Sequence, residues 1–266
     1  MALPQIQSPQ VVESPQVVVV GGLDPGGGAG LLRDLATVAA LGARAHAVGT
    51  AWTEQGNGVH RVEPRDPAAV RQALAHALAT LKPGAVKIGM AVGPATGAAL
   101  REALTGFGGP VVVDPVLASS RGGSLWADAP GALLPLLRRA TLVTPNAVEA
   151  AALAGCAVTT PDEAEAAARQ LVETAGLAAV LVKGGHLAAD GGEVVDLLVT
   201  RSQVVRLRRP RLAGASPRGT GCALATAIAV ELARGRELAT AAASGGEWLA
   251  GRIAAARDVG GERRLP

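Results

Sequence analysis

The sequence is almost empty of aromatic residues: among 266 residues there is no tyrosine and only one phenylalanine, Phe107. Proteins that bind nucleic acids stack bases on aromatic side chains and gather their basic residues in stripes or patches. Here the 25 lysines and arginines are spread thinly along the chain, although the net charge is +3. We therefore expect no nucleic-acid partner.

Long apolar runs are also missing. No run approaches the roughly 18 apolar residues of a membrane-spanning helix, so we expect no membrane partner. The first residues, MALPQIQSPQ, lack the basic start and the apolar stretch of a secretory signal. The two cysteines, Cys156 and Cys222, are too few for a disulfide framework, and the four histidines show no metal-ligand spacing. These absences indicate a cytoplasmic protein without a zinc site.

Short apolar strands and helices alternate along most of the chain. Apolar runs predict strands at 16–22, 45–51, 85–90, 110–116, 140–146 and 178–185. Between them, the pattern predicts helices at 29–42, 66–81, 94–106, 130–139, 146–154 and 161–176. Strands that are apolar throughout are typical of a parallel sheet covered by helices on both faces. The sequence therefore predicts an α/β fold, a Rossmann-like three-layer sandwich with a central, mostly parallel sheet.

The pattern changes after residue 185. Residues 193–200 and 202–210 predict an antiparallel pair at the edge of the sheet, and two helices at about 219–234 and 237–257 close the chain. No linker interrupts the order of these elements.

The uninterrupted order predicts a single domain at 16–257. Residues 1–15 are rich in Gln, Pro and Ser, and we expect them to form a flexible N-terminal tail. Residues 258–266 are expected to form a C-terminal tail.

Ligands of an open parallel sheet bind beyond the carboxyl ends of its strands. The unusual residues of this sequence fall there: GGLDPGGGAG (21–30), TAWTEQ (50–55), KIGM (87–90), VDPV (113–116), TPN (144–146) and KGG (183–185). We therefore expect a ligand-binding crevice at this edge of the sheet.

The glycine-rich turn at 21–30 is neither a G-x-G-x-x-G dinucleotide fingerprint nor a phosphate-binding loop that ends in Gly-Lys-Ser/Thr. Its backbone N–H groups can approach a ligand closely, and Asp24 is its one charge. The alternative is a tight connection that needs positive φ angles.

Charged and polar residues follow three other predicted strands. Asp114 ends one strand, where its carboxylate would face the crevice, and Lys183 ends another beside a glycine pair, which suits a nucleotide phosphate or a turn. Asn146 and Glu149 lie three residues apart, on one face of a helix start. The alternative for these two is a helix cap, with Asn146 as the N-cap and Glu149 as its capping-box partner.

The stretch RGTGC (218–222) places Cys222 at the start of a helix. Gly219 and Gly221 bracket Thr220, and the unpaired N–H groups of the helix start would bind an anion. The same field is expected to lower the pKa of the Cys222 thiol from ~8.5. The alternative is a buried, inert cysteine, which we expect Cys156 to be.

Taken together and in this order, the motifs resemble those of the hydroxymethylpyrimidine/phosphomethylpyrimidine kinases of thiamine synthesis, in the ribokinase-like superfamily. GLDPGGGAGLLRDL resembles the family's G-S-D-P-S-G-G-A-G-x-x-x-D-L opening, and TAWTEQ resembles its T-A-L-x-x-Q. KIGM, VDPV, VKGGH and GTGC match as they stand, and TPNAVEA matches T-P-N-x-x-E-A. The resemblance spans about residues 16–250. Before its GTGC the family has Thr-His, where this chain has Pro217 and Arg218.

The resemblance implies a ribokinase-like fold and a role for each motif residue. The residues that would bind the pyrimidine are Gly22, Asp24, Ala29, Gln55, Met90 and Val116. The carboxamide of Gln55 would read the aminopyrimidine edge. The catalytic group would consist of Gly219, Thr220, Gly221 and Cys222, with the cysteine accepting or orienting the hydroxyl proton. Lys183 and Asn146 would face ATP, and Asp114 and Glu149 would act around Mg²⁺.

The activity that the resemblance implies is transfer of phosphate from MgATP to 4-amino-5-hydroxymethyl-2-methylpyrimidine and then to the resulting monophosphate. The expected partners are the pyrimidine, ATP with Mg²⁺, a monovalent cation as a further option, and a second copy of the chain in a homodimer. The alternatives are a pyridoxal or pyridoxine kinase, whose relatives share the cysteine motif, and a non-catalytic relative that binds a pyrimidine or nucleotide.

Overall fold

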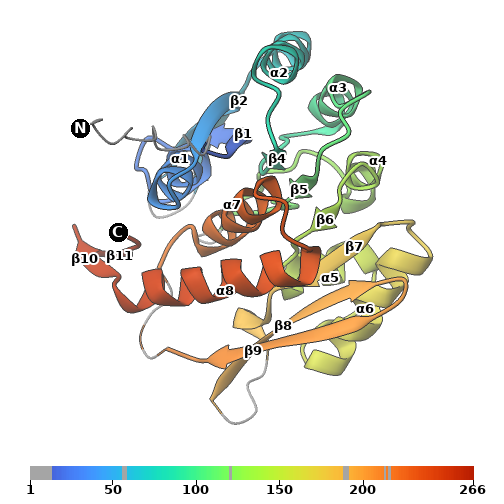
Figure 1. Cartoon of the computed structure of the whole chain (residues 1–266), viewed down its shortest axis with the longest axis vertical. Coiled ribbons are helices and arrows are strands. Elements are labelled where there is room, and N and C mark those ends of the chain that lie inside the picture. The colour runs from blue at the N-terminus through green and yellow to red at the C-terminus, as the bar shows by residue number, and fades with distance from the viewer. Residues whose placement is uncertain (1–13, 56–58, 120–121, 188–191, 213, 215–216) are drawn as a thin grey trace, which may run out of the picture.

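The apolar run VVVV lies in strand β1 (Gln16–Leu23), inside a nine-stranded sheet with the order β3-β2-β1-β4-β5-β6-β7-β8-β9 (Figure 1). The computed structural model describes residues 14–55, 59–119, 122–187, 192–212, 214 and 217–266. The other strands of this sheet are β2 (Arg44–Gln55), β3 (Val59–Pro64), β4 (Ala85–Ile88), β5 (Val111–Val113), β6 (Leu142–Val143), β7 (Ala179–Val182), β8 (Glu193–Thr200) and β9 (Val204–Pro210). All the pairings from β2 through β7 are parallel, which confirms the predicted sheet.

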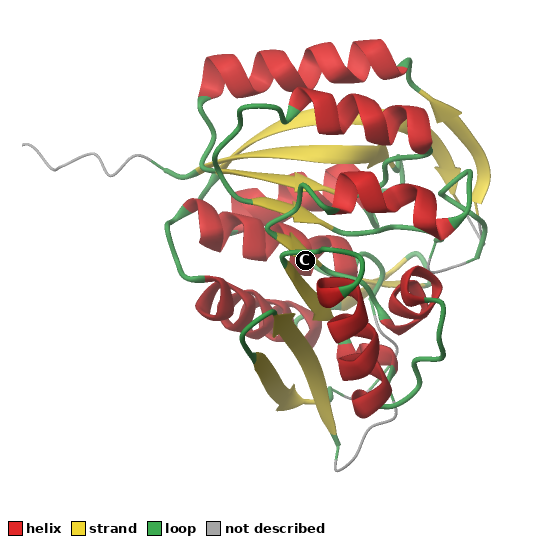
Figure 2. Cartoon of the chain, turned by 90° about the vertical axis from the view of Figure 1, so that its right-hand side faces the viewer, coloured by secondary structure: helices red, strands yellow, loops and turns green. Residues whose placement is uncertain are grey.

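Helices cover both faces of the sheet (Figures 1 and 2). One face carries α1 (Gly30–Ala40), α7 (Thr220–Ala233) and α8 (Leu238–Ala254). The other carries α2 (Pro67–Leu81), α3 (Pro94–Ala103), α4 (Leu134–Leu137), α5 (Ala147–Ala154) and α6 (Pro161–Glu173). Val17 and Val19 of β1 pack under the first group, and Val18 and Val20 under the second. The three-layer sandwich is therefore confirmed, and its two cores lie on opposite faces of the same strands.

Most helix ends lie close to their predicted positions because the capping residues are local signals. Asp66 caps α2 by accepting a hydrogen bond from the Ala68 amide, with Pro67 as the first helical residue. The predicted helix at 130–139 is only partly an α-helix. Residues Pro130–Leu133 form a 3₁₀ helix and only Leu134–Leu137 form an α-helix, because prolines interrupt the segment.

Three strands were not predicted. The edge strand β3 pairs antiparallel with β2, which extends to Gln55, well past the predicted end. Near the end of the chain, β10 (Arg257–Val259) and β11 (Glu262–Arg264) form a small hairpin where we expected only a tail. These strands are rich in charged residues and lack the apolar runs by which the other strands were found. The predicted antiparallel pair at the opposite edge, β8 with β9, is confirmed.

None of the helices in the described part of the chain combines the length and the apolarity that crossing a bilayer requires.

The end of β7 passes very close to β8. The amide of Gly184 donates to Asp196 Oδ1 at 2.7 Å, and a Cβ on Gly184 would lie 1.9 Å from the carbonyl oxygen of Val195. The neighbouring Gly185 is exposed, and a Cβ there would meet open space. Only the first glycine of this pair is therefore required by packing.

We expect Gly184→Ala to lower the free energy of unfolding by about 1–3 kcal/mol, because backbone atoms must move to admit the methyl group. Gly185→Ala is the matched control and should change stability little. Urea unfolding of both variants checks this. Equal stabilities of the two variants would contradict the packing argument.

Candidate active site

A cluster of three charged side chains lies at the carboxyl ends of neighbouring strands. Lys183, after β7, places its Nζ 2.7 Å from Asp114 Oδ1, after β5, and 3.7 Å from Glu149 Oε2, in the first turn of α5. Thr144, after β6, donates to the same Asp114 oxygen at 3.3 Å. Asp114 and Glu149 are buried, and Lys183 is nearly so. The structure thus brings together the residues that we predicted at the nucleotide and the metal.

The charges in this cluster shift one another's pKa. Burial raises the pKa of Glu149 to about 7; nearby Lys183 opposes this rise and Asp114 adds to it. Burial opposes the charge on Lys183, but the carboxylates of Asp114 and Glu149 outweigh burial and raise the pKa of that ammonium. Lys183 is therefore a permanent positive charge at this edge of the sheet.

Glu149 also has a structural task. Its Oε2 accepts from the Asn146 amide at 2.7 Å, and Asn146 Oδ1 accepts from the Glu149 amide at 2.9 Å. The capping-box alternative is therefore confirmed for this pair. The side-chain oxygen of Asn146 is bonded to the backbone of the helix start. One carboxylate both caps α5 and faces Lys183.

The first turn of α7 lies between this cluster and the glycine-rich loop, by which we mean residues 24–30. Gly219, the N-cap, has φ +78°, and a Cβ on it would lie 2.2 Å from the Gly28 carbonyl oxygen. A Cβ on Gly221 would lie 3.2 Å from Lys183 Nζ and 3.5 Å from Asp114 Oδ2. The helix start can therefore present backbone N–H groups next to the Lys183 ammonium, an arrangement that binds anions.

Cys222 lies in this first turn; its surface is partly exposed, but protein groups surround its thiol. Burial raises the pKa of its thiol to about 11; Lys87 and the Gly30 amide lower it, while Asp34 and Asp114 raise it further. The lowered pKa that we expected is therefore wrong for this structure. The field of the helix start is outweighed by burial and by two nearby carboxylates. Cys156, which we expected to be buried, is exposed because it follows Gly155, the left-handed residue that ends α5.

Beneath the start of α7 lies a charged pair that the sequence analysis missed. Lys87 of β4 donates to both carboxylate oxygens of Asp34 of α1, at 2.9 and 2.7 Å, and Thr226 of α7 donates to Asp34 at 2.8 Å. All three side chains are buried. A lysine inside the apolar strand AVKI and an aspartate inside the apolar helix GLLRDL were the available signals. Residues of this kind are almost never fully buried unless paired.

Asp24 organises the glycine-rich loop. Its carboxylate accepts from the amides of Gly26 at 3.1 Å and Ala29 at 3.3 Å, and it lies 3.1 Å from Nη2 of Arg218. Gly30 has φ +60°, and a Cβ there would lie 2.3 Å from the Gly22 carbonyl oxygen. The tight-connection alternative is therefore confirmed for this loop.

Some of the predicted pyrimidine-binding residues lie close to one another. Met90 belongs to a small apolar cluster against which Val116 packs, and a Cβ on Gly22 would lie 2.8 Å from Met90 Sδ. Ala29 belongs to the glycine-rich loop and is the N-cap of α1. Gln55 ends β2, and its side chain lies outside the described residues.

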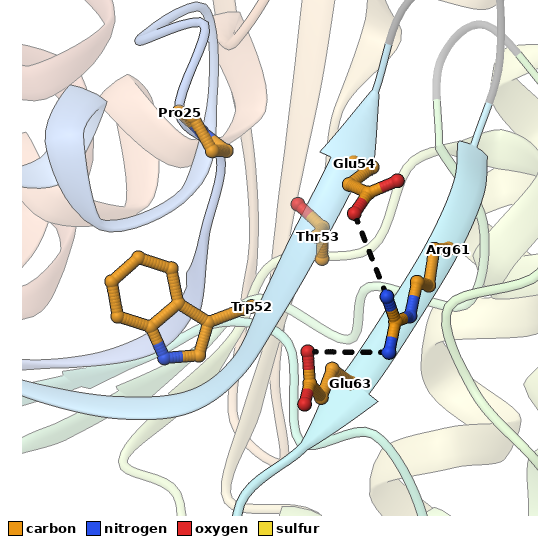
Figure 3. A pocket seen from close by; sticks show the side chains of 6 residues that line it. All are labelled: Pro25, Trp52, Thr53, Glu54, Arg61 and Glu63. Carbon is orange, nitrogen blue, oxygen red and sulfur yellow. Dashed lines mark ion pairs between the residues drawn. The ribbon is translucent and has the colours of Figure 1, made fainter.

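A shallow pocket lies on the outer face of the β2–β3 hairpin, lined by Pro25, Trp52, Thr53, Glu54, Arg61 and Glu63 (Figure 3). Trp52 is 58% exposed, whereas Ala51 and Thr53 on either side of it are buried. Because side chains alternate along a strand, Trp52 faces away from the apolar cluster around Met90. None of the predicted site residues lines this pocket, so we do not assign the active site to it.

The donor set around Lys183 fits Mg²⁺. This ion binds oxygen ligands and in kinases is held by one or two carboxylates together with substrate phosphates. Asp114 and Glu149 supply two carboxylates next to the phosphate-suited start of α7. Within the described ranges no group of three or more His, Cys, Asp and Glu side chains comes together as a metal cage.

The chain is similar to known proteins over most of its length. The family model for phosphomethylpyrimidine kinase matches residues 24–265. A hydroxymethylpyrimidine/phosphomethylpyrimidine kinase of Rhizobium meliloti is 41% identical over 241 residues, which cover 89% of this chain and 90% of that protein.

Solved structures agree with the fold. The phosphomethylpyrimidine kinase from Clostridium difficile 630 matches with a TM-score of 0.76 at 29% identity, covering 90% of this chain and 100% of the other. The pyridoxal kinase from Staphylococcus aureus, solved in complex with AMP-PCP and pyridoxal, matches with a TM-score of 0.82 at 25% identity, covering 95% of this chain and 93% of the other.

The two cysteines should differ in reactivity. With a pKa of about 11, only about one Cys222 thiol in a thousand is ionised at pH 8. We expect iodoacetamide at pH 8 to alkylate the exposed Cys156 at least about tenfold faster than Cys222, because the thiolate is the nucleophile. Peptide mass spectrometry over a time course measures both rates in one sample. Faster labelling of Cys222 would show that its thiol is activated after all.

Proposed function

The chain belongs to the phosphomethylpyrimidine kinase family, and on that premise we propose that it uses ATP to phosphorylate 4-amino-5-hydroxymethyl-2-methylpyrimidine and then its monophosphate, in thiamine biosynthesis. The observation that carries the proposal is the cluster of Lys183, Asp114 and Glu149 beside the glycine-flanked start of α7. Phosphoryl transfer depends mainly on positioning and on neutralising charge at the phosphate oxygens. This cluster supplies both.

Each group has a separate task in the proposed reaction. The amides at 219–222 donate hydrogen bonds to phosphate oxygens. Lys183 adds a positive charge directly beside them, since a Cβ on Gly221 would lie 3.2 Å from its Nζ. Asp114 and Glu149 would hold Mg²⁺, which when bound supplies further positive charge to the phosphates. The pyrimidine ring is held by Met90, Val116 and the glycine-rich loop. The carboxamide of Gln55 forms hydrogen bonds with the edge of the ring.

Cys222 accepts the proton in this proposal. The pyrimidine hydroxyl oxygen forms a bond to the γ-phosphorus of ATP, the bond from that phosphorus to the ADP oxygen breaks, and the hydroxyl proton passes to the sulfur. A pKa of about 11 means that the accepting thiolate is scarce at neutral pH. As the pH increases toward the pKa, the thiolate fraction rises about tenfold for each pH unit. The rate of the reaction should rise with it. In the second transfer an oxygen of the monophosphate attacks instead.

The direct test of the function is to incubate the protein with MgATP and, in turn, hydroxymethylpyrimidine, its monophosphate and pyridoxal, and to follow ADP release. We expect turnover with the first two and little with pyridoxal; a reaction without acceptor measures background hydrolysis. Turnover with pyridoxal alone would assign the chain to the kinase activity named for its structural neighbour from Staphylococcus aureus. Turnover with none would favour a non-catalytic relative.

Cys222→Ala should lower kcat by about 100-fold or more, the usual scale for loss of a catalytic base. The wild-type kcat/KM should rise between pH 7 and 9, and the variant should lose this rise. Cys156→Ala is the matched control, because it removes the exposed cysteine and should leave kcat unchanged. Near-normal turnover of Cys222→Ala would remove this thiol from the mechanism.

The homodimer and the cytoplasmic location stay predictions from the sequence, and a monovalent cation stays an option.

A further inference from the structure

Arg218 stands directly before the first glycine of GTGC and is almost fully buried, with 7% of its side chain exposed. Its Nη2 lies 3.1 Å from Asp24 Oδ2, and Asp24 in turn accepts from the amides of Gly26 and Ala29. This ion pair therefore ties the glycine-rich loop to the residue that precedes α7.

Packing brings the same two segments into contact. A Cβ on Gly28 would lie 3.1 Å from Arg218 Cδ and 3.2 Å from its Nη1, so the arginine side chain lies directly on the loop backbone. On the next residue, a Cβ on Gly219 would meet the Gly28 carbonyl oxygen. The close approach of the loop to the start of α7 therefore requires glycine at position 219.

A third segment joins them from the end of the chain, residues 262–266, which we call the C-terminal strap. The Arg218 amide donates to the Arg263 carbonyl oxygen at 3.4 Å. The backbones of Arg218 and Arg264 pair in parallel, as two residues of neighbouring β-strands do. Arg264 Nη1 donates to the Gly26 carbonyl oxygen at 2.8 Å. The strap thus contacts both Arg218 and the glycine-rich loop.

The strap is itself anchored to the body of the protein. Leu265 is buried among the residues under α1, α7 and α8, and Arg33 of α1 donates to its carbonyl oxygen at 3.1 Å. Figure 1 shows the hairpin of β10 and β11 beside the end of α8. Because Leu265 anchors the strap to the core, Arg264 of the strap can hold the glycine-rich loop in place.

A glycine-rich loop has high conformational freedom, so holding it in one conformation before the substrate arrives lowers the entropic cost of binding. The loop carries Asp24 and Ala29 of the predicted pyrimidine site, while Lys183 and Glu149 lie on the other side of the first turn of α7. Loosening the loop should therefore affect the pyrimidine and not ATP.

We propose that Arg218, through Asp24 and the C-terminal strap, is a positioning residue that holds the glycine-rich loop against the start of α7 and thereby sets the affinity for the pyrimidine. The proposal rests on the proposed function for the identity of the substrate. The arginine fork pairs with Asp24 and lies against Gly28, contacts that a lysine ammonium reproduces only in part, whereas Arg218 contacts the strap through its backbone.

The test compares Arg218→Ala, Arg218→Lys and the matched control Arg138→Ala. Arg138 donates through Nε to the backbone carbonyl of Ala175, and because it precedes β6 it lies at the amino ends of the strands, away from the predicted site. In Arg218→Ala we expect the KM for hydroxymethylpyrimidine to rise about tenfold and the KM for ATP to stay within about twofold. Arg218→Lys should recover part of this loss, and Arg138→Ala should match the wild type. An equal rise of both KM values, or an unchanged KM for the pyrimidine, would overturn the proposal.

A second readout needs no turnover. Amide hydrogen exchange of residues 24–30 should become faster in Arg218→Ala than in the wild type and the control, because the tie to the loop is gone. Unchanged exchange there would overturn the proposal, whatever the activity. Wild-type protein that turns over none of the acceptors would count against the proposed function alone, since the exchange experiment would still decide the role of Arg218.

Arg264→Ala covers the case in which Arg218→Ala fails to fold, because it leaves the pair of Arg218 and Asp24 in place. We expect the same selective rise of the pyrimidine KM, smaller in size. In the double variant the two effects should be non-additive, since both residues act on one loop. Additive effects, or no effect of Arg264→Ala on exchange in the loop, would overturn the role of the strap.

Discussion

A lysine ammonium buried in the middle of the sheet needs a counter-charge, and the rest of the site depends on how this chain supplies it. Lys87 donates to both carboxylate oxygens of Asp34, and the Thr226 hydroxyl donates a third hydrogen bond to Asp34. Removing such a pair from water is costly, so only good geometry makes it tolerable. Even Gly89 belongs to this constraint, because a Cβ there would lie 2.9 Å from the ammonium nitrogen. The pair therefore fixes α1 and α7 against β4, and with them the starts of these two helices.

The fold and much of the site could be predicted because their signals are local. Apolar runs located the parallel strands, and Asp114 and Lys183 came together because the carboxyl ends of parallel strands share one edge. The thiol of Cys222 shows the limit of this reasoning. A helix start is visible in a sequence, but the burial and the carboxylates that raise the pKa of that thiol come from other segments. The contact between Asp24 and Arg218 is equally long-range, so no spacing rule could find it.

Glu149 illustrates how closely the fold and the chemistry are joined at this edge of the sheet. Its carboxylate caps α5 by accepting from the Asn146 amide, and it also lies 3.7 Å from Lys183 Nζ. A substitution there would disturb the helix start and the charge balance together. The site is thus built from groups that the fold already requires, and it cannot be altered without altering the elements that carry it.

The exposed Trp52 beside Pro25 gives the molecule a built-in optical reporter. The chain has three tryptophans, no tyrosine and one phenylalanine, so indole rings dominate its near-ultraviolet emission. Trp126 is buried and Trp248 lies 5.7 Å from the Arg252 guanidinium, whereas Trp52 faces solvent next to the glycine-rich loop. Movement of that loop would change the polarity around one indole and leave the other two as an internal reference. The fluorescence spectrum of the unlabelled protein therefore follows the glycine-rich loop.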